Sequence, residues 1–177
     1  MSPRTNSVFL VGLMAVGKST VGRLLADELG FVFHDSDRVI EQRAGADVAW
    51  IFDVEGEQGF REREAQVIEE LTQLSGIVLA TGGGVIVREE NRLRLRERGT
   101  VVWLDTPIDR LVERTRRDKR RPLLRGGDTR GTLERLSQER RPLYEGIAHL
   151  RFCADRSTPK SLATEIAAAC RAAALPS

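Results

Sequence analysis

Short apolar runs alternate along the chain with longer segments in which apolar residues recur every three or four positions. The apolar runs occupy residues 8–11, 31–33, 77–80, 100–104 and 150–153. Such runs, bounded by glycine or polar residues, predict buried strands, whereas the longer segments predict amphipathic helices. Buried strands that alternate with helices indicate a parallel sheet covered on both faces, and therefore a three-layer α/β fold.

The helical segments have recognisable ends. One helix is predicted over residues 18–29 and another over 89–98, and helical periodicity covers 38–74 with breaks at Gly45 and at 56–59. Glycine is the residue that most often ends or interrupts a helix.

Two further helices are predicted to begin at a Thr-Pro pair. Thr106-Pro107 and Thr158-Pro159 each offer a threonine as N-cap and a proline in the first turn. The second of these helices runs into the alanine-rich end of the chain.

The composition agrees with a globular protein that has an anionic partner. The 177 residues suit a single domain over 1–177, and the net charge is only +2, yet arginines crowd residues 110–141. Phosphate-bearing small molecules and nucleic acid both remain possible partners. Aromatic residues are 5% of the chain and none lies among these arginines, so a stacking platform is missing and we expect no nucleic acid.

The remaining compositional features point to the cytoplasm. The two cysteines, Cys153 and Cys170, cannot form a disulfide framework, and we interpret them as small apolar residues. The start of the chain lacks the pattern of a signal peptide, and no apolar run has membrane-spanning length. We therefore expect a cytoplasmic protein without a membrane partner, and a monomer.

The strongest motif is a phosphate-binding loop. Residues 12–19 read GLMAVGKS and fit the pattern G-x-x-x-x-G-K-[ST], with an apolar strand before them and a helix after them. Glycines let the backbone N–H groups surround phosphate oxygens, and the helix presents its positive end to the same anion. Lys18 is predicted to reach the β- and γ-phosphates and Ser19 to ligate Mg²⁺. A chance glycine-bearing turn is the alternative, and the flanking strand and helix argue against it.

Two carboxylates follow the second predicted strand. We assign Asp35 to the Mg²⁺ shell and Asp37 to the hydroxyl that accepts the phosphoryl group, where a carboxylate can orient the nucleophile and take its proton. The alternative interpretation is that residues 35–37 only cap the next helix.

A second glycine-rich loop follows the third strand. The residues Thr81, Gly82, Gly83 and Gly84 permit close approach of a ligand to the backbone. Since ligands of α/β sheets collect beyond the carboxyl ends of the strands, we favour a binding loop over an unoccupied flexible one.

Charged residues complete the candidate site. Arg61 and Glu64 lie one turn apart, so that Glu64 can orient Arg61 toward a bound carboxylate, although most charges near them are expected on a solvated helix face. Residues 115–128 are predicted to form a lid whose arginines neutralise the transferring phosphoryl group and whose closure excludes water. Arg140 and Arg141 are candidates to anchor an acceptor anion.

These motifs together resemble the shikimate kinase family over nearly the whole chain. The resemblance is carried by residues 9–12, Gly17-Lys18-Ser19-Thr20, Asp35-Ser36-Asp37, Ile51-Phe52, Glu57 with Phe60-Arg61, residues 81–84, residues 121–124 and Arg140 with Pro142-Leu143-Tyr144. The phosphate loop alone is generic to P-loop kinases, whereas the later motifs are specific. The resemblance implies a five-stranded parallel sheet in the order 2-3-1-4-5 and a lid that closes on ATP.

The resemblance also implies a reaction and residue roles. ATP and shikimate would give ADP and shikimate 3-phosphate, a step in chorismate and aromatic amino acid biosynthesis, with Mg²⁺ as cofactor. Lys18, Asp37 and Arg121 would be catalytic, with residues 35–64 as the acceptor-binding subregion. Shikimate would contact Asp37, Arg61, Gly82, Gly83, Gly84 and Arg140. ATP would contact Gly12, Ala15, Val16, Gly17, Lys18, Ser19, Thr20, Arg114, Arg121 and Pro159.

One residue departs from the family pattern, and two rival functions remain. Ala15 stands where the family commonly has glycine, which bears on the loop conformation. The first rival is a kinase of the same fold that acts on gluconate or a nucleoside monophosphate. The second is an inactive binding module, against which the presence of Lys18, Asp37 and Arg121 argues.

Overall fold

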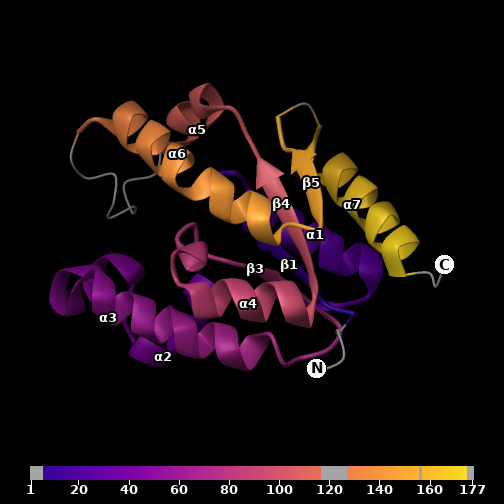
Figure 1. The fold of residues 1–177 in the computed structure, drawn as a ribbon, viewed down its shortest axis with the longest axis horizontal. Helices are drawn as coiled ribbons and strands as arrows, with labels where there is room; N and C mark the ends of the chain where they lie inside the picture. Colours follow the sequence, from indigo (N-terminus) through magenta and orange to yellow (C-terminus); the bar gives the residue numbers. More distant parts are fainter. Residues whose placement is uncertain (1–5, 117–126, 156, 175–177) are drawn as a thin grey trace.

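A five-stranded parallel sheet forms the centre of the protein, in the order β2-β3-β1-β4-β5 (Figure 1). The computed structural model describes residues 6–116, 127–155 and 157–174. The strands are β1 (Val8–Val11), β2 (Val32–Asp35), β3 (Ile77–Ala80), β4 (Thr100–Asp105) and β5 (Leu150–Cys153). The predicted architecture and strand order are confirmed.

The central strands are apolar throughout because helices cover both of their faces. Every residue of β1 and β3 is buried, whereas β2 and β5 at the sheet edges are partly exposed. The strand β2 extends two residues beyond the predicted run, through His34 to Asp35. Asp35 pairs with Ala80 of β3, so the loops that follow these two strands begin side by side.

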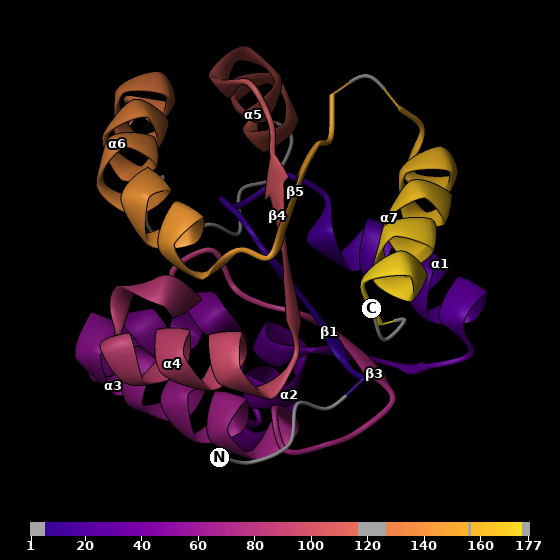
Figure 2. The same cartoon turned by 45° about the vertical axis from the view of Figure 1, so that its right-hand side comes forward.

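Two groups of helices cover the sheet, one on each face (Figures 1 and 2). One face carries α1 (Lys18–Leu29) and α7 (Pro159–Ala174), which pack on each other. The other face carries α3 (Val48–Leu71), α4 (Glu89–Arg98) and α6 (Thr129–Ile147). The short elements are α2 (Ser36–Ala44), the 3₁₀ turn η1 (Val85–Val87) and α5 (Ile108–Thr115).

The helical stretch after β2 is interrupted at the two predicted glycines. Gly45 ends α2 in the left-handed conformation (φ 68°), and Gly56 kinks α3 with φ 76° and ψ 175°. The kink separates the first turns of α3 from the long part that carries Arg61 and Glu64. Residues from both parts line the cavity described below.

One predicted cap is confirmed and the other is wrong. The hydroxyl of Thr158 accepts a hydrogen bond from the N–H of Ser161 at the start of α7 (3.1 Å). Helix α5 instead begins at Ile108 with Pro107 as its N-cap and no side-chain cap. Thr106 is buried beyond the end of β4, one residue too early to reach the first free N–H groups of this helix.

Candidate functional site

The phosphate loop connects β1, the central strand, to α1. Gly17 at the N-cap has φ 97° and Ala15 has φ 66°, so Ala15 adopts the left-handed conformation that glycine tolerates best. The alanine therefore keeps the loop geometry at the cost of some backbone strain. The Nζ of Lys18 donates to the carbonyls of Gly12 and Leu13 at 2.7 and 2.8 Å. The positive end of α1 and the lysine thus face the same concave loop, an arrangement that binds phosphate.

Asp35 joins the phosphate loop to the acceptor region. Its Oδ2 accepts a hydrogen bond from the Ser19 hydroxyl at 2.6 Å. Its Oδ1 accepts from the N–H groups of Asp37 and Arg38 and thereby caps α2. The two interpretations weighed for this carboxylate are thus compatible, since one oxygen caps the helix and the other contacts the serine of the loop.

An open cavity of about 460 Å³ runs from the phosphate loop to the kinked helix α3. It lies at the carboxyl ends of β1, β2 and β3, where ligands of such sheets bind. The predicted site residues that line it are Ala15, Gly17, Lys18, Ser19, Thr20, Asp35, Asp37, Arg61, Gly82, Gly83, Gly84, Arg114 and Arg140. The structure therefore brings most of the candidate site together around one space.

The acceptor end of the cavity is built on a buried ion pair. Arg61 donates to Glu64 at 3.0 Å and lies 3.5 Å from Glu57, and both Arg61 and Glu64 are buried. Burial raises the pKa of the Glu64 carboxyl, although the Arg61 guanidinium opposes this shift. Glu64 therefore orients Arg61, as their spacing predicted, and the guanidinium keeps its remaining face toward the cavity.

The three glycines leave room for the charged groups around them. A β-carbon at Gly82 would lie 2.8 Å from Asp37 Oδ1 and 3.0 Å from Glu64 Oε2. A β-carbon at Gly84 would lie 2.2 Å from Arg61 Nη2. The N–H of Gly82 is tied to the buried hydroxyl of Ser36 at 3.2 Å. The absence of side chains in this loop is therefore a requirement of close packing.

Arg140 brings a second guanidinium to the same end of the cavity. It is 4% exposed, and burial lowers the pKa of its guanidinium. Within the described parts of the chain, its Nη1 atom is buried and makes no hydrogen bond. A buried donor atom without a hydrogen-bond partner, on a cationic side chain that lines a cavity, is suited to an anionic ligand.

Four predicted site residues are not among the lining residues: Gly12, Val16, Arg121 and Pro159. Arg114, which does line the cavity, donates to the backbone carbonyls of Ala15 and Val16 at 3.1 Å. The side chain of Val16 is buried, so Val16 takes part in this contact through its carbonyl. Gly12 takes part in the phosphate loop through its carbonyl, which accepts a hydrogen bond from Lys18. Pro159 is exposed at the start of α7 and is not among the lining residues. Arg121 and most of the predicted lid fall outside the described residues.

Sequence reasoning missed the apolar wall of the acceptor end. Phe52 and Phe60 line the cavity with ring centroids 4.8 Å apart, and Met14 and Val48 complete this wall. The sequence did contain a signal for this wall: the two phenylalanines flank Gly56, a glycine that interrupts the helix. A kink at Gly56 brings one ring toward the other.

The described residues contain neither a cluster of metal-ligating side chains nor a membrane-spanning helix. In the described ranges there is no group of three or more His, Cys, Asp or Glu side chains arranged to hold a metal ion. No helix among the described residues is both long and apolar enough to cross a membrane.

Comparisons with known proteins match the chain over most of its length. The family "Shikimate kinase" matches residues 14–171. A shikimate kinase of Legionella pneumophila is 54% identical over 163 residues, which are 92% of this chain and 93% of the relative. A shikimate kinase of Shewanella denitrificans is 56% identical over 90% of this chain and 94% of its own.

The fold matches solved structures equally well. The shikimate kinase from Acinetobacter baumannii in complex with shikimate has a TM-score of 0.94 at 44% identity, covering 97% of this chain and 96% of that one. A gluconokinase from Sinorhizobium meliloti, at 18% identity and a TM-score of 0.60, shares the fold alone.

Proposed function

Since the chain belongs to the shikimate kinase family, we propose that it transfers the γ-phosphoryl group of ATP to the 3-hydroxyl of shikimate. The products are shikimate 3-phosphate and ADP, in chorismate and aromatic amino acid biosynthesis. The single observation that carries this proposal is the shared cavity, which places a phosphate loop beside two buried arginines and a carboxylate. A polyol carboxylate as the acceptor offers its own carboxylate group to the two arginines and a hydroxyl to the carboxylate of Asp37.

On the donor side, the loop and the start of α1 bind the β- and γ-phosphates. Lys18 exchanges its bonds to the Gly12 and Leu13 carbonyls for phosphate oxygens, where its charge offsets the charge of the transferring group. Arg114, held by two loop carbonyls, lies against the adenine, with the region of Pro159 beyond it. Arg121 acts from the lid.

The donor set at Ser19 and Asp35 fits Mg²⁺. A hydroxyl and a carboxylate oxygen lie 2.6 Å apart beside the phosphate loop, and Mg²⁺ prefers one or two such oxygens together with substrate phosphates and water. Ser19 would hold the ion directly and Asp35 through water. Bound there, the ion supplies positive charge to the β- and γ-phosphates.

On the acceptor side, Arg61 and Arg140 bind the carboxylate of shikimate and the loop of Gly82, Gly83 and Gly84 contacts its ring. Asp37 then holds the reacting hydroxyl and takes its proton as the new P–O bond forms. The apolar wall of Phe52 and Phe60 faces the carbon skeleton of the substrate.

The first test is a coupled assay of ADP release with Mg·ATP. We expect stimulation by shikimate and none by gluconate, by nucleoside monophosphates or without an acceptor. Stimulation by one of the other acceptors would overturn the acceptor assignment, and no stimulation by any would support a binding module.

The role of Asp37 has its own test. Asp37→Asn is expected to lower kcat by roughly 10²- to 10³-fold while the KM for ATP changes by less than about twofold, because only the hydroxyl loses its base. An unaltered kcat would remove Asp37 from the mechanism. A single domain over 1–177, the monomeric state and the cytoplasmic location stay predictions.

A further inference from the structure

The hydroxyl of Tyr144 lies between two parts of the acceptor end of the cavity. It donates a hydrogen bond to the Gly83 carbonyl at 2.7 Å, and it also contacts the guanidinium of Arg140. We propose that Tyr144 is a positioning residue, whose hydroxyl fixes Arg140 and the triple-glycine loop relative to each other for recognition of the acceptor carboxylate. The inference rests on the proposed function, because it assumes that Arg140 binds the acceptor.

The chemistry of a phenol suits this position. A neutral hydroxyl has one hydrogen to donate and lone pairs that accept, so it can bond the Gly83 carbonyl and receive an N–H of Arg140 at the same time. Tyr144 is 1% exposed, and burial raises the pKa of its hydroxyl far above the range in which enzymes work. The hydroxyl therefore remains a hydrogen-bond donor at every working pH.

Both partners need such a restraint. The loop residue Gly83 has no side chain with which to fix its own position, and a β-carbon there would lie 3.6 Å from Arg140 Nη1. Arg140 lies one helical turn before Tyr144 on α6, so the two side chains extend from the same face of the helix. The Nη1 atom of Arg140 makes no hydrogen bond in the described parts of the chain, so the orientation of this guanidinium is not fixed through that atom.

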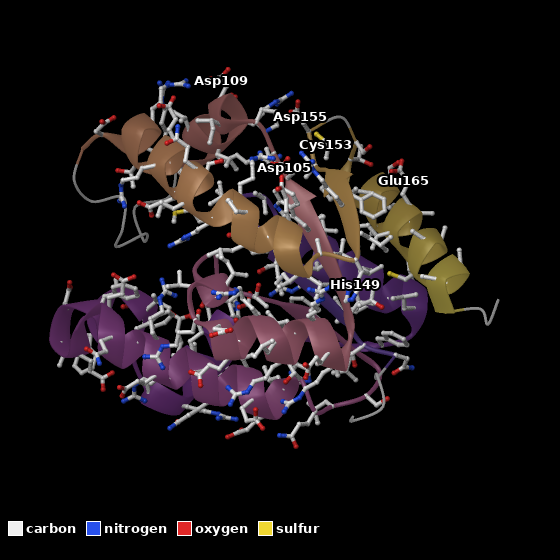
Figure 3. All side chains as sticks on the ribbon, viewed as in Figure 1. Asp105, Asp109, His149, Cys153, Asp155 and Glu165 are labelled. Atoms are coloured by element: carbon white, nitrogen blue, oxygen red, sulfur yellow. The ribbon has the colours of Figure 1, made fainter. Side chains whose placement is uncertain are left out.

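Other contacts hold α6 on the sheet without the hydroxyl. The Tyr144 ring stacks on Trp103 of β4 at 5.7 Å. Arg141, the neighbour of Arg140, lies over the same tryptophan and donates to Asp105 at 3.3 Å; Figure 3 labels this aspartate at the end of β4. Removal of the hydroxyl alone should therefore leave the helix in place and release only the restraint on Arg140 and Gly83.

The test is Tyr144→Phe, which keeps the ring and removes the hydroxyl. We expect the KM for shikimate to rise about tenfold, as for the loss of hydrogen bonds to a charged group, with the KM for ATP within about twofold of wild type. Calorimetric titration of shikimate into the folded variant should show the same weakening.

The matched control is Thr72→Val. Thr72 is also fully buried, and its hydroxyl donates to the Ile68 carbonyl at 2.6 Å, but it lies at the end of α3 and does not line the cavity. This variant should lose stability without any change in either KM. If Tyr144→Phe affects both substrates equally, or behaves like the control, the hydroxyl is only structural and the inference fails.

A double-mutant cycle with Arg140→Lys tests the proposed route. If Tyr144 acts through Arg140, adding Tyr144→Phe to Arg140→Lys should raise the shikimate KM by less than about twofold, because the restrained group is already gone. Independent, multiplying effects would overturn the inference. Absence of shikimate turnover in the wild-type protein would instead overturn the proposed function, so the two failures are distinguishable.

Discussion

The substitution Gly84→Ala offers a sharp test of the acceptor site, because the backbone accepts it and the site does not. Gly84 has φ −98° and ψ 9°, which an alanine adopts without strain. Its new β-carbon would lie 2.2 Å from Arg61 Nη2, 2.5 Å from the guanidinium carbon and 2.6 Å from Nη1. The whole cost of the added methyl group therefore falls on the Arg61 guanidinium.

The size of the displacement follows from these distances. Ordinary contact needs about 3.5 Å, so the guanidinium must retreat by about 1.3 Å. A shift of that size stretches the 3.0 Å bond to Glu64 beyond hydrogen-bonding distance and moves Arg61 out of register with a carboxylate. Misplacement by about 1 Å costs on the order of 10²-fold, so we expect the KM for shikimate to rise about 100-fold. The KM for ATP should change by less than about twofold.

The assay is coupled ADP release at varied shikimate with saturating ATP, and then the reverse, with circular dichroism to establish folding. Gly146→Ala is the matched control: Gly146 lies in α6, and a β-carbon there meets nothing within 4 Å. That variant should gain up to about 1 kcal/mol of stability, with both KM values unchanged. A shikimate KM for Gly84→Ala within about threefold of wild type would refute the assignment of Arg61.

Three further substitutions test the physical argument elsewhere in the chain. Burial raises the folded-state pKa of Glu64, so its ionisation destabilises the fold increasingly as the pH rises through that value. The free energy of unfolding of Glu64→Gln minus that of wild type should therefore increase from about pH 4 to about pH 8 in urea titrations, and a constant difference would contradict the shift. Ala15→Gly should relieve left-handed strain of about 1 kcal/mol, offset in part by greater unfolded-state entropy, so thermal unfolding should show a gain of at most about 1 kcal/mol. Gly22→Ala should lose about 1–3 kcal/mol with both KM values unchanged, because the new β-carbon would lie 2.7 Å from the Phe33 ring; unchanged stability would show that α1 packs loosely on the sheet.

The sequence predicted most of what is decided by local pattern. The phosphate loop follows from a buried run and turn glycines, the strand order from the family resemblance, and the Arg61–Glu64 pair from helical spacing. The cap at Thr106 was predicted wrongly, because the first residue of a helix depends on where the preceding strand ends and how the chain turns after it.

Contacts across long separations could not be predicted from the sequence in the same way. The hydroxyl of Tyr144 reaches a carbonyl 61 residues away, and no periodicity encodes which glycine it meets. The apolar wall of Phe52 and Phe60 required knowledge that the kink at Gly56 turns these rings together. Such details depend on tertiary packing, which a single sequence expresses only through residue type.

The double use of Asp35 limits how the protein can change over generations. One of its carboxylate oxygens accepts a hydrogen bond from the serine of the phosphate loop, and the other accepts from the first N–H groups of α2. Asparagine would retain a helix cap but give up the negative charge, and glutamate would retain the charge but move it by a methylene group. Few single-step replacements can satisfy both demands, so we expect this position to tolerate few substitutions. A mutational scan of Asp35 would then show few tolerated replacements at a side chain that the donor and acceptor halves of the enzyme share.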